Sequence, residues 1–281
     1  MKCLICNKKE TVKFLDDYKL EMKEDKDYFK DAKIYRCNDC DFSFVHPMPT
    51  AKTLEYFYKY VYRSGGRPPY LVSENYEDQI KHYLEDKNLS YLLYLTTLID
   101  VRKIENFYDF GSGDGDLGYA LKKKFPQLNL FCSEGDSQCE KILKDRGYVN
   151  YKDLNEINKK FDLIVTTHSL EHLSDINSIF FKFKEMLNPN GFIFFEVPHC
   201  PEEYWKGRPY DGPHLLFYTK KSIEILAEKH GFKFLNCSNS AYTFSEDHRY
   251  QRDSQDLYHK GKSSLFSLSK IKKIIKKFVP N

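Results

Sequence analysis

Asp109-Phe110-Gly111-Ser112-Gly113-Asp114-Gly115 is the segment from which the fold of this 281-residue chain can be predicted. It ends an apolar run, NFYDF (106–110), and precedes DLGYALKKKF (116–125), whose apolar residues recur every three to four positions. A strand, a glycine-rich turn and a helix in this order are typical of nucleotide-binding α/β folds. Glycine lets the chain turn sharply and lets its backbone approach a ligand closely. The segment therefore predicts a ligand-binding turn at one edge of a parallel sheet.

The alternation of strand and helix continues to about residue 238. Short segments rich in β-branched or aromatic residues predict strands, and segments with helical spacing of apolar residues predict helices. The strands are NLFCSE (129–134), YVNYKD (148–153), FDLIVTT (161–167), GFIFFEV (191–197) and FKFLNCS (232–238); the helices are SQCEKILKDRG (137–147), INSIFFKFKEMLN (176–188) and TKKSIEILAEKHG (219–231), the last ending at Gly231 as a C-cap. This pattern predicts a parallel sheet with helices on both faces.

An acidic residue ends the second of these strands. Glu134 follows the glycine turn by about 20 residues, where an acid in dinucleotide-binding folds accepts hydrogen bonds from ribose hydroxyls. The turn and Glu134 together predict a pocket for an adenosine-containing cofactor. Gly113, Gly115 and Gly118 also satisfy G-x-G-x-x-G, so a nicotinamide or flavin nucleotide is an alternative at this point.

The arrangement D-x-G-x-G-x-G in residues 109–115 resembles motif I of the class I S-adenosylmethionine-dependent methyltransferases. FDLIVTTHSLEHLSDINSIFFKFKEMLNPNGFIFFEVP (161–198) is similar to that family's fourth strand, L-E-H loop, helix, N-P-x-G turn and fifth strand. The resemblance implies a Rossmann-like α/β fold with a mostly parallel, seven-stranded sheet. It also implies a set of cofactor-binding residues for S-adenosyl-L-methionine: Asp109, Gly111, Gly113 and Gly115 at the amino-acid end, Glu134 at the ribose, and Asp153 with Leu154 beside the adenine. The alternative is structural: glycines in a tight turn, and Glu134 or Asp153 capping a helix.

Two C-x-x-C pairs near the N-terminus predict a metal site. Cys3 and Cys6 form one pair, and Cys37 and Cys40 form the other. Four thiolates complete a tetrahedron around Zn²⁺ and leave no open position, so the expected role of the ion is structural. The intervening segment predicts strands and a charged turn, as in a small zinc ribbon. Reduced thiols without a metal are the alternative.

Histidines follow two of the predicted strands, at the carboxyl edge of the sheet where ligands bind in such folds. His168 and His172 come after FDLIVTT, and His214 comes from the loop after GFIFFEV. An imidazole titrates near neutral pH and can remove a proton from a methyl acceptor. His172 or His214 is therefore the predicted general base, with His168 as a third candidate. The aromatic and charged residues predicted to shape the acceptor pocket are Tyr204, Trp205, Arg208 and Tyr210.

The histidine segment has two other interpretations. His172 at a helix entrance can simply satisfy backbone groups. His168, Glu171 and His172 also form H-x-x-E-H, which is similar to the divalent-metal loop of ubiquinone-type O-methyltransferases. The family has Glu where this chain has His168, and hard Mg²⁺ prefers oxygen ligands.

Composition narrows the functional classes. A formal net charge of +3, with 41% hydrophobic and 30% charged residues, is typical of a globular protein and demands no polyanionic partner. The ribbon segment is balanced in sign, which speaks against a nucleic-acid-binding module. No apolar run reaches the roughly 18 to 20 residues that a membrane span needs, and no signal-peptide core is evident. A cytoplasmic protein is therefore expected.

Four regions are predicted: a zinc ribbon (1–48), a linker and helical segment packed on the core (49–104), the S-adenosylmethionine-binding domain (105–245) and a C-terminal extension (246–281). The extension contains a basic amphipathic helix with its apolar residues at helical spacing: Leu265, Leu268, Ile271, Ile275 and Phe278. Such a helix either rests weakly on an anionic membrane surface or docks on protein.

The cysteine-rich region followed by a methyltransferase domain resembles sugar C-methyltransferases and bacterial proteins of capsule and lipopolysaccharide assembly. The resemblance implies a small-molecule acceptor, a sugar or glycan precursor, that is methylated on oxygen or, as the alternative, on carbon. An NAD-dependent oxidoreductase and a zinc-ribbon protein that binds nucleic acid are the alternatives from other classes. The oligomeric state is not predicted.

Overall fold

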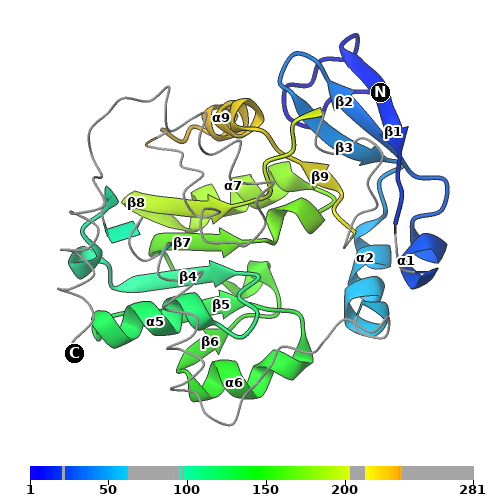
Figure 1. Ribbon diagram of the computed structural model, residues 1–281. Coiled ribbons are helices and arrows are strands. Elements are labelled where there is room, and N and C mark those ends of the chain that lie inside the picture. Colours follow the sequence, from blue (N-terminus) through cyan, green and yellow to red (C-terminus); the bar gives the residue numbers. More distant parts are fainter. Residues whose placement is uncertain are drawn as a thin grey trace, which may run out of the picture. The chain divides into compact units, whose positions relative to one another are not determined.

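A parallel five-stranded sheet carries the glycine turn (Figure 1). The computed structural model describes residues 1–20, 23–62, 91, 95–96, 98–202, 213–233 and 235. The strands are β4 (Asn106–Phe110), β5 (Asn129–Ser133), β6 (Tyr148–Asn150), β7 (Phe161–Thr167) and β8 (Leu187–Glu196). Their spatial order is β6-β5-β4-β7-β8, so the order reverses at β4, where open α/β sheets bind their ligands. The Rossmann-like prediction is confirmed, with five strands in the described residues where seven were predicted.

The helices lie where apolar periodicity predicted them. They are α5 (Asp116–Lys124), α6 (Glu140–Asp145), α7 (Ile176–Met186) and α9 (Lys220–Lys229). The end of α9 has the predicted glycine cap, because Gly231 has a φ of +72° and the amide of Phe232 donates to the carbonyl of Ala227 at 2.9 Å. The strand predicted after it is absent at Phe232, Lys233 and Leu235, and its other residues lie outside the described ones.

Strand β8 begins four residues earlier than predicted. Phe161 pairs with Leu187, the register then shifts, and regular pairing resumes at Phe192. Asp162, at the shift, accepts hydrogen bonds from the Asn106 amide at 2.9 Å and the Asn188 side chain at 2.6 Å. The turn expected at residues 188–191 is therefore an irregularity inside a longer strand, stabilised by one carboxylate.

The N-terminal region forms an antiparallel sheet of β1 (Val12–Asp17), β2 (Lys33–Cys37) and β3 (Phe42–His46). The charged turn predicted between β1 and β2 contains a short helix instead, α1 (Lys23–Tyr28). This helix was missed because its residues, KEDKDY, lack apolar periodicity. After β3 the chain continues through α2 (Ala51–Tyr56), which Thr50 caps, and η1 (Phe57–Val61).

A strand that follows the parallel sheet in sequence completes the N-terminal sheet. β9 (Leu216–Phe217) pairs antiparallel with β3, and the amide of Val45 donates to the carbonyl of Leu215 at 2.9 Å. Buried apolar residues of both sheets belong to one continuous core. The predicted ribbon is thus joined to the region of the parallel sheet by β9 as well as by the linker. No local sequence signal indicated this pairing.

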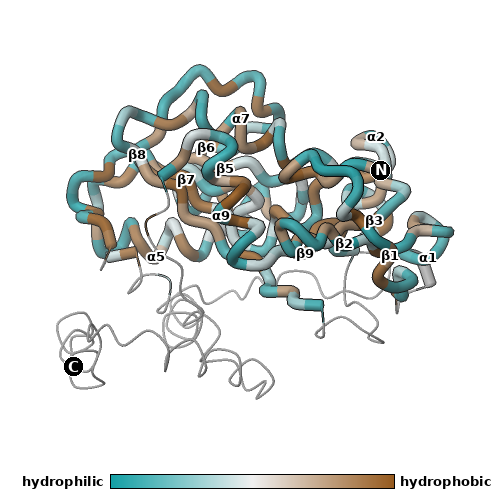
Figure 2. The backbone as a smooth tube through the Cα atoms, turned by 90° about the horizontal axis from the view of Figure 1, so that it is seen from above, coloured by the Kyte–Doolittle hydropathy of each residue, from teal (hydrophilic) through white to brown (hydrophobic). Residues whose placement is uncertain are grey.

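The hydrophobic core follows the central strands. Phe161, Leu163, Ile164 and Val165 of β7 are fully buried, and brown segments run through the middle of the sheet in Figure 2. In the described part of the chain, no helix is long and apolar enough to cross a membrane. The predicted amphipathic helix in 246–281 and most of the helical segment between residues 63 and 97 lie outside the described residues.

Candidate active site

The glycine turn connects β4 to α5, and its conformation requires glycine. Gly111, Gly113 and Gly115 have φ values of +70°, +57° and +79°, in the left-handed region that side chains disfavour. A Cβ on Gly111 would lie 2.1 Å from the side-chain oxygen of Ser169. Ser169 also donates from this oxygen to the Gly111 carbonyl at 3.3 Å. The turn is therefore packed directly against the segment that carries His168 and His172.

The later glycines of the pattern have a packing role. A Cβ on Gly115 would lie 2.6 Å from the ring of Tyr148, and one on Gly118 would lie 2.1 Å from its hydroxyl. The same hydroxyl donates to the Gly115 carbonyl at 2.9 Å. Gly118, which completed the dinucleotide-type pattern, is thus explained by a buried tyrosine. Gly115 shares this structural explanation, and its predicted contact with the cofactor stays a prediction.

Two carboxyl groups lie at the turn. Asp109 is buried near the end of β4, and burial, followed by the charges of Glu134 and Asp114, raises its pKa to about 8. Burial also raises the pKa of Glu134. Glu134 accepts hydrogen bonds from the amides of Gly113 at 2.7 Å and Asp136 at 2.8 Å. Carboxyl groups that resist ionisation favour a bound cation, because a positive charge nearby stabilises their charged form.

This charge distribution distinguishes the two candidate cofactors. S-adenosylmethionine carries a sulfonium and an ammonium group, whereas a nicotinamide dinucleotide brings a negatively charged diphosphate to the glycine turn. Asp109 therefore suits the first ligand and opposes the second, whereas the carboxylate of Glu134 suits the ribose of either. A Cβ on Gly135, which follows Glu134 in the chain, would meet no atom within 4 Å.

A buried arginine fixes the far side of the turn. One guanidinium nitrogen of Arg146 lies 2.5 Å from the carboxylate of Asp116 and donates to the Asp114 carbonyl at 2.7 Å. Arg146 directly follows α6, so this contact ties α6 to the start of α5. Sequence reasoning missed it because residues 114 and 146 are distant in the chain.

Asp153 and Leu154 follow β6. The Asp153 carboxylate caps a short turn, η4 (Leu154–Glu156), by accepting a hydrogen bond from the Asn155 amide at 2.8 Å. From the sequence, this capping role was the alternative to a contact of Asp153 with the adenine. Leu154 is half-buried against the core. Their predicted position beside the adenine stays a prediction.

The three predicted catalytic histidines come together at the carboxyl edge of β7 and β8. His168 follows β7 with a φ of +51°, and its Nε2 lies 2.9 Å from the carboxylate of Glu196 at the end of β8. Tyr91 donates to the same carboxylate at 2.7 Å. His172 lies in η5 (Leu170–His172), and its ring centroid is 4.8 Å from that of His214.

A buried carboxylate lies beside these imidazoles. Glu171 is 1% exposed, and one of its oxygens lies 3.6 Å from Nδ1 of His168. Burial acts to raise its pKa, but the histidines His168, His172 and His214 outweigh burial and lower it. Burial, followed by the charge of His172, lowers the pKa of His214 to about 3. Glu171 is therefore ionised and His214 neutral at neutral pH.

The N-terminal region holds two of the histidines in place. Tyr58 of η1 forms a hydrogen bond with Nδ1 of His172 at 2.9 Å, and Tyr18 donates to the backbone carbonyl of His214 at 2.7 Å. The amide of Leu215 donates to the Glu171 carbonyl at 2.7 Å. Sequence reasoning missed Tyr58 and Glu196, of which only Glu196, at the end of a predicted strand, had a usable signal. Glu171 was noted only as part of the H-x-x-E-H pattern.

The predicted acceptor-pocket residues Tyr204, Trp205, Arg208 and Tyr210 lie outside the described residues. Ser169, which contacts both the glycine turn and the histidine segment, makes the two candidate sites neighbours. A glycine turn with two carboxyl groups, next to a cluster of histidines and a carboxylate, can hold a sulfonium donor beside a nucleophile that must lose a proton.

Residues 79–236, more than half of the chain, match the family described as "Methyltransferase domain". The chain belongs to this family. The predicted enzyme class, an S-adenosylmethionine-dependent methyltransferase, is thereby confirmed, and the nicotinamide-dependent alternative loses its basis. No curated protein matches the chain.

Solved structures of low identity are similar to this methyltransferase in fold. DesVI of Streptomyces venezuelae is 13% identical, with 61% of this chain and 97% of that chain covered and a TM-score of 0.48. A putative O-methyltransferase of Nostoc punctiforme is 15% identical, with 53% and 51% covered and a TM-score of 0.43. A possible histamine N-methyltransferase of Thermotoga maritima is 16% identical, with 57% and 78% covered and a TM-score of 0.44. The methyltransferase thus spans about half the length of the Nostoc protein.

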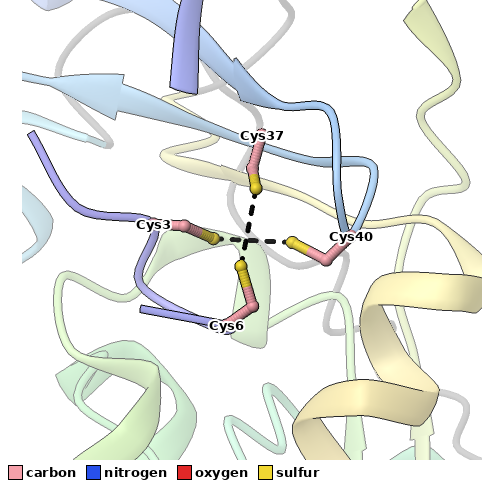
Figure 3. A group of neighbouring side chains, drawn as sticks. All are labelled: Cys3, Cys6, Cys37 and Cys40. Carbon is pink, nitrogen blue, oxygen red and sulfur yellow. Dashed lines mark hydrogen bonds between the residues drawn. The ribbon is translucent and has the colours of Figure 1, made fainter. Parts of the chain in front are cut away.

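The four paired cysteines of the methyltransferase converge as their spacing predicted (Figure 3). All four sulfur atoms lie within 4.8 Å of one another; Cys3 Sγ is 3.5 Å from Cys40 Sγ, and Cys6 Sγ is 3.5 Å from Cys37 Sγ. The residue after each pair, Asn7 or Asp41, has a φ of +62° or +56°, a conformation that Asn and Asp tolerate. The two turns therefore face each other with their thiols inward, which fits a tetrahedral ion with four soft ligands.

The first cysteine turn is anchored to the catalytic part. Nζ of Lys229, at the end of α9, donates to the carbonyl of Ile5 at 2.9 Å and to the Asn177 side chain at 2.7 Å. Asn177, in α7, donates to the carbonyl of Leu4 at 2.8 Å. The cysteine cluster is thus positioned to hold the N-terminal sheet against α7 and α9.

Proposed function

We propose that this methyltransferase transfers a methyl group from S-adenosylmethionine to a hydroxyl oxygen of a sugar, a nucleotide sugar or a phosphate-type decoration in capsule or lipopolysaccharide synthesis. The single observation that carries the reaction type is the contact of Ser169 with Gly111, which makes the donor turn and the histidine cluster neighbours. The sugar class of the acceptor rests on the resemblance of the cysteine-rich region and its adjoining domain to sugar methyltransferases. The reaction is expected in the cytoplasm.

The donor is held by the turn. Asp109 and Glu134 provide negative charge for the ammonium and hydrogen-bond acceptors for the ribose, and Gly111 and Gly113 allow the backbone to approach the amino-acid end. Asp153 and Leu154 would lie beside the adenine. S-adenosylmethionine has no phosphate group, which agrees with the acidic side chains at the turn.

The acceptor loses its proton at the histidine cluster. His168, His172 and His214, with the ionised Glu171, promote removal of the hydroxyl proton, and the oxygen then attacks the methyl carbon in line with the carbon–sulfur bond. The bond to sulfur breaks, its electron pair stays on sulfur, and S-adenosylhomocysteine leaves. Tyr204, Trp205, Arg208 and Tyr210 are proposed to contact the acceptor.

We also propose that Cys3, Cys6, Cys37 and Cys40 bind one structural Zn²⁺. The convergence of the four sulfurs supports this assignment. A closed thiolate site has no position for the acceptor, so its ion serves the fold and not the chemistry.

The function is tested with donor carrying a ¹³C-labelled methyl group and a panel of nucleotide sugars and glycan phosphates. We expect a labelled product whose methyl carbon has the NMR shift of an O-methyl group. A C-methyl shift would establish the alternative reaction on carbon. No transfer to any sugar-containing acceptor, from protein that binds the donor, would contradict the proposed acceptor class. The Asp109→Asn variant, weakened in donor binding, serves as the control for background transfer.

A further inference from the structure

We propose that Glu171, His172 and His214 bind a divalent transition-metal ion at a second metal site, separate from the cysteine cluster. The site leaves a coordination position for an oxygen of the acceptor. Binding of the ion stands independently of the proposed function, whereas its use on the acceptor rests on that function.

The geometry comes from two segments held together by backbone contacts. One ligand atom from each of Glu171, His172 and His214 lies within 4.8 Å of the others. The amide of Leu215 donates to the Glu171 carbonyl at 2.7 Å, which fixes residue 214 beside residue 171. Three donors that gather from the end of β7 and the start of β9 need only small adjustments to reach the roughly 2.0 to 2.2 Å of metal bonds.

The strongest indication is the carboxylate of Glu171. It is 1% exposed, and within the described residues neither of its oxygens has a hydrogen-bond donor. Nδ1 of His168, at 3.6 Å, lies beyond hydrogen-bond distance. Burying a carboxylate without donors is costly, and buried charges are normally paired or coordinate metals. A cation between Glu171, His172 and His214 would provide the missing partner.

The surroundings of His172 resemble the outer shell of a metal site. Tyr58 forms a hydrogen bond with Nδ1 of His172 at 2.9 Å, so Nε2 is the ring nitrogen proposed to bind the ion. Metal-binding histidines commonly use their second ring nitrogen in this way, and the bond fixes the tautomer and the orientation of the ring. Tyr18 plays a related part for His214 by donating to its backbone carbonyl at 2.7 Å.

The ligand set selects the class of metal. Two imidazoles and one carboxylate suit Zn²⁺, Fe²⁺, Co²⁺ or Mn²⁺, whereas Mg²⁺ prefers oxygen ligands and retains water. The three protein ligands found among the described residues leave at least one position open, as in catalytic sites. A hydroxyl bound there has a lowered pKa and releases its proton to water. His172 and His214 would then act on the acceptor through the ion.

The test is titration with Co²⁺ of full-length protein that holds one equivalent of zinc, enough for the cysteine cluster alone, followed by absorption spectroscopy. We expect one equivalent to bind with the d–d bands of nitrogen and oxygen ligands and without thiolate-to-cobalt charge-transfer bands. Glu171→Gln and His214→Ala should each weaken this binding by more than about 100-fold. His46→Ala, which replaces an exposed histidine of β3, should leave it unchanged.

Donor affinity and thermal unfolding show whether each variant is folded. If one of the two variants does not fold, His172→Ala is used in its place. Absence of cobalt binding, cobalt bound only by thiolates, or binding insensitive to these substitutions would overturn the proposal. Cobalt binding without methyl transfer to any sugar would contradict the proposed function and leave the metal site standing. Full transfer after removal of the second ion, with zinc retained, would show that the acceptor does not use it.

Discussion

Tyr58 and His172 form a 2.9 Å hydrogen bond although 114 residues separate them in the chain. The bond connects η1, in the N-terminal region, to the histidine cluster at the end of β7. A phenol at Nδ1 fixes both the orientation of the imidazole and the position of its proton. The chemistry of the catalytic sheet is therefore coupled to the N-terminal region.

Tyr58→Phe should lower kcat for methyl transfer by about 10-fold, which corresponds to about 1.4 kcal/mol, a typical value for one hydrogen bond. The affinity for S-adenosylmethionine should not change, because Tyr58 lies outside the glycine turn. Steady-state kinetics and donor titration measure both quantities. Tyr60→Phe, at an exposed tyrosine of the same segment, is the matched control. Equal kcat values for the two variants would show that the bond has no role in the reaction.

Donor affinity should rise with pH. Burial and the charges of Glu134 and Asp114 raise the pKa of Asp109 to about 8, so this carboxyl is protonated in the free protein at lower pH. A cationic donor pairs with the carboxylate, and binding therefore releases a proton. Affinity should increase by up to about tenfold per pH unit between about pH 6 and 8 and level off above. Isothermal titration calorimetry in buffers of different ionisation enthalpy measures the number of protons released on donor binding.

The Asp109→Asn variant should bind the donor more weakly, with a flatter pH dependence. The same pKa shift makes the free wild-type protein less stable as pH rises from about 4 to about 8, because the unfolded chain ionises Asp109 first. Proton uptake on donor binding, or an unchanged pH profile in Asp109→Asn, would be incompatible with a buried, protonated Asp109.

Gly118→Ala should destabilise the fold. A Cβ there would lie 2.1 Å from the hydroxyl of Tyr148 and 2.5 Å from the ring of Phe107. Overpacking of this kind lowers the free energy of unfolding by about 1 to 3 kcal/mol. Gly135→Ala, where a Cβ meets nothing within 4 Å, should stay within about 0.5 kcal/mol of the wild type. Denaturant unfolding measures both, and similar losses at the two positions would contradict the packing role of Tyr148.

Loss of the zinc ion proposed for the cysteine cluster should abolish transfer but not donor binding. Cys37→Ser removes one of the four ligands, and the N-terminal sheet carries the supports that Tyr18 and Tyr58 give to His214 and His172. The glycine turn belongs to the other sheet and should still bind the donor. Cys139→Ala, a buried cysteine outside the cluster, is the control. Elemental analysis measures the zinc content of each variant, and an activity assay measures methyl transfer. Transfer by a variant that has lost zinc would contradict this prediction.

Local patterns predicted much of the fold. The apolar segments at 106–110, 129–133 and 161–167 form strands as expected, and the helices between them begin near the predicted residues. The extended start of β8 could not be predicted, because it depends on hydrogen bonds that Asp162 accepts from β4 and from Asn188. The pairing of β9 with β3 was missed for a similar reason: two residues, Leu216 and Phe217, contain no signal for a distant partner.

The candidate site shows the same division between local and long-range information. The cysteine pairs and the glycine turn are short motifs whose residue spacing predicts a local turn. The structure has the predicted turn in each case. Glu171 was noted only within the H-x-x-E-H pattern. Its burial beside His214, which comes from another loop, could not be predicted from that pattern. Asp153 is the opposite case. Its carboxylate accepts a hydrogen bond from the nearby Asn155 amide, and this local capping role was one of the two interpretations of the sequence.

The central claim is that the turn at residues 109–115 and Glu134 bind S-adenosylmethionine. Isothermal titration of zinc-loaded protein with the donor, with S-adenosylhomocysteine and with NAD tests it most directly. We predict saturable binding of about one equivalent of the first two ligands, no binding of NAD, and marked weakening in Asp109→Ala and Glu134→Ala. Folded protein that binds neither S-adenosylmethionine nor S-adenosylhomocysteine, or that binds them equally well without both carboxylates, would contradict the assignment.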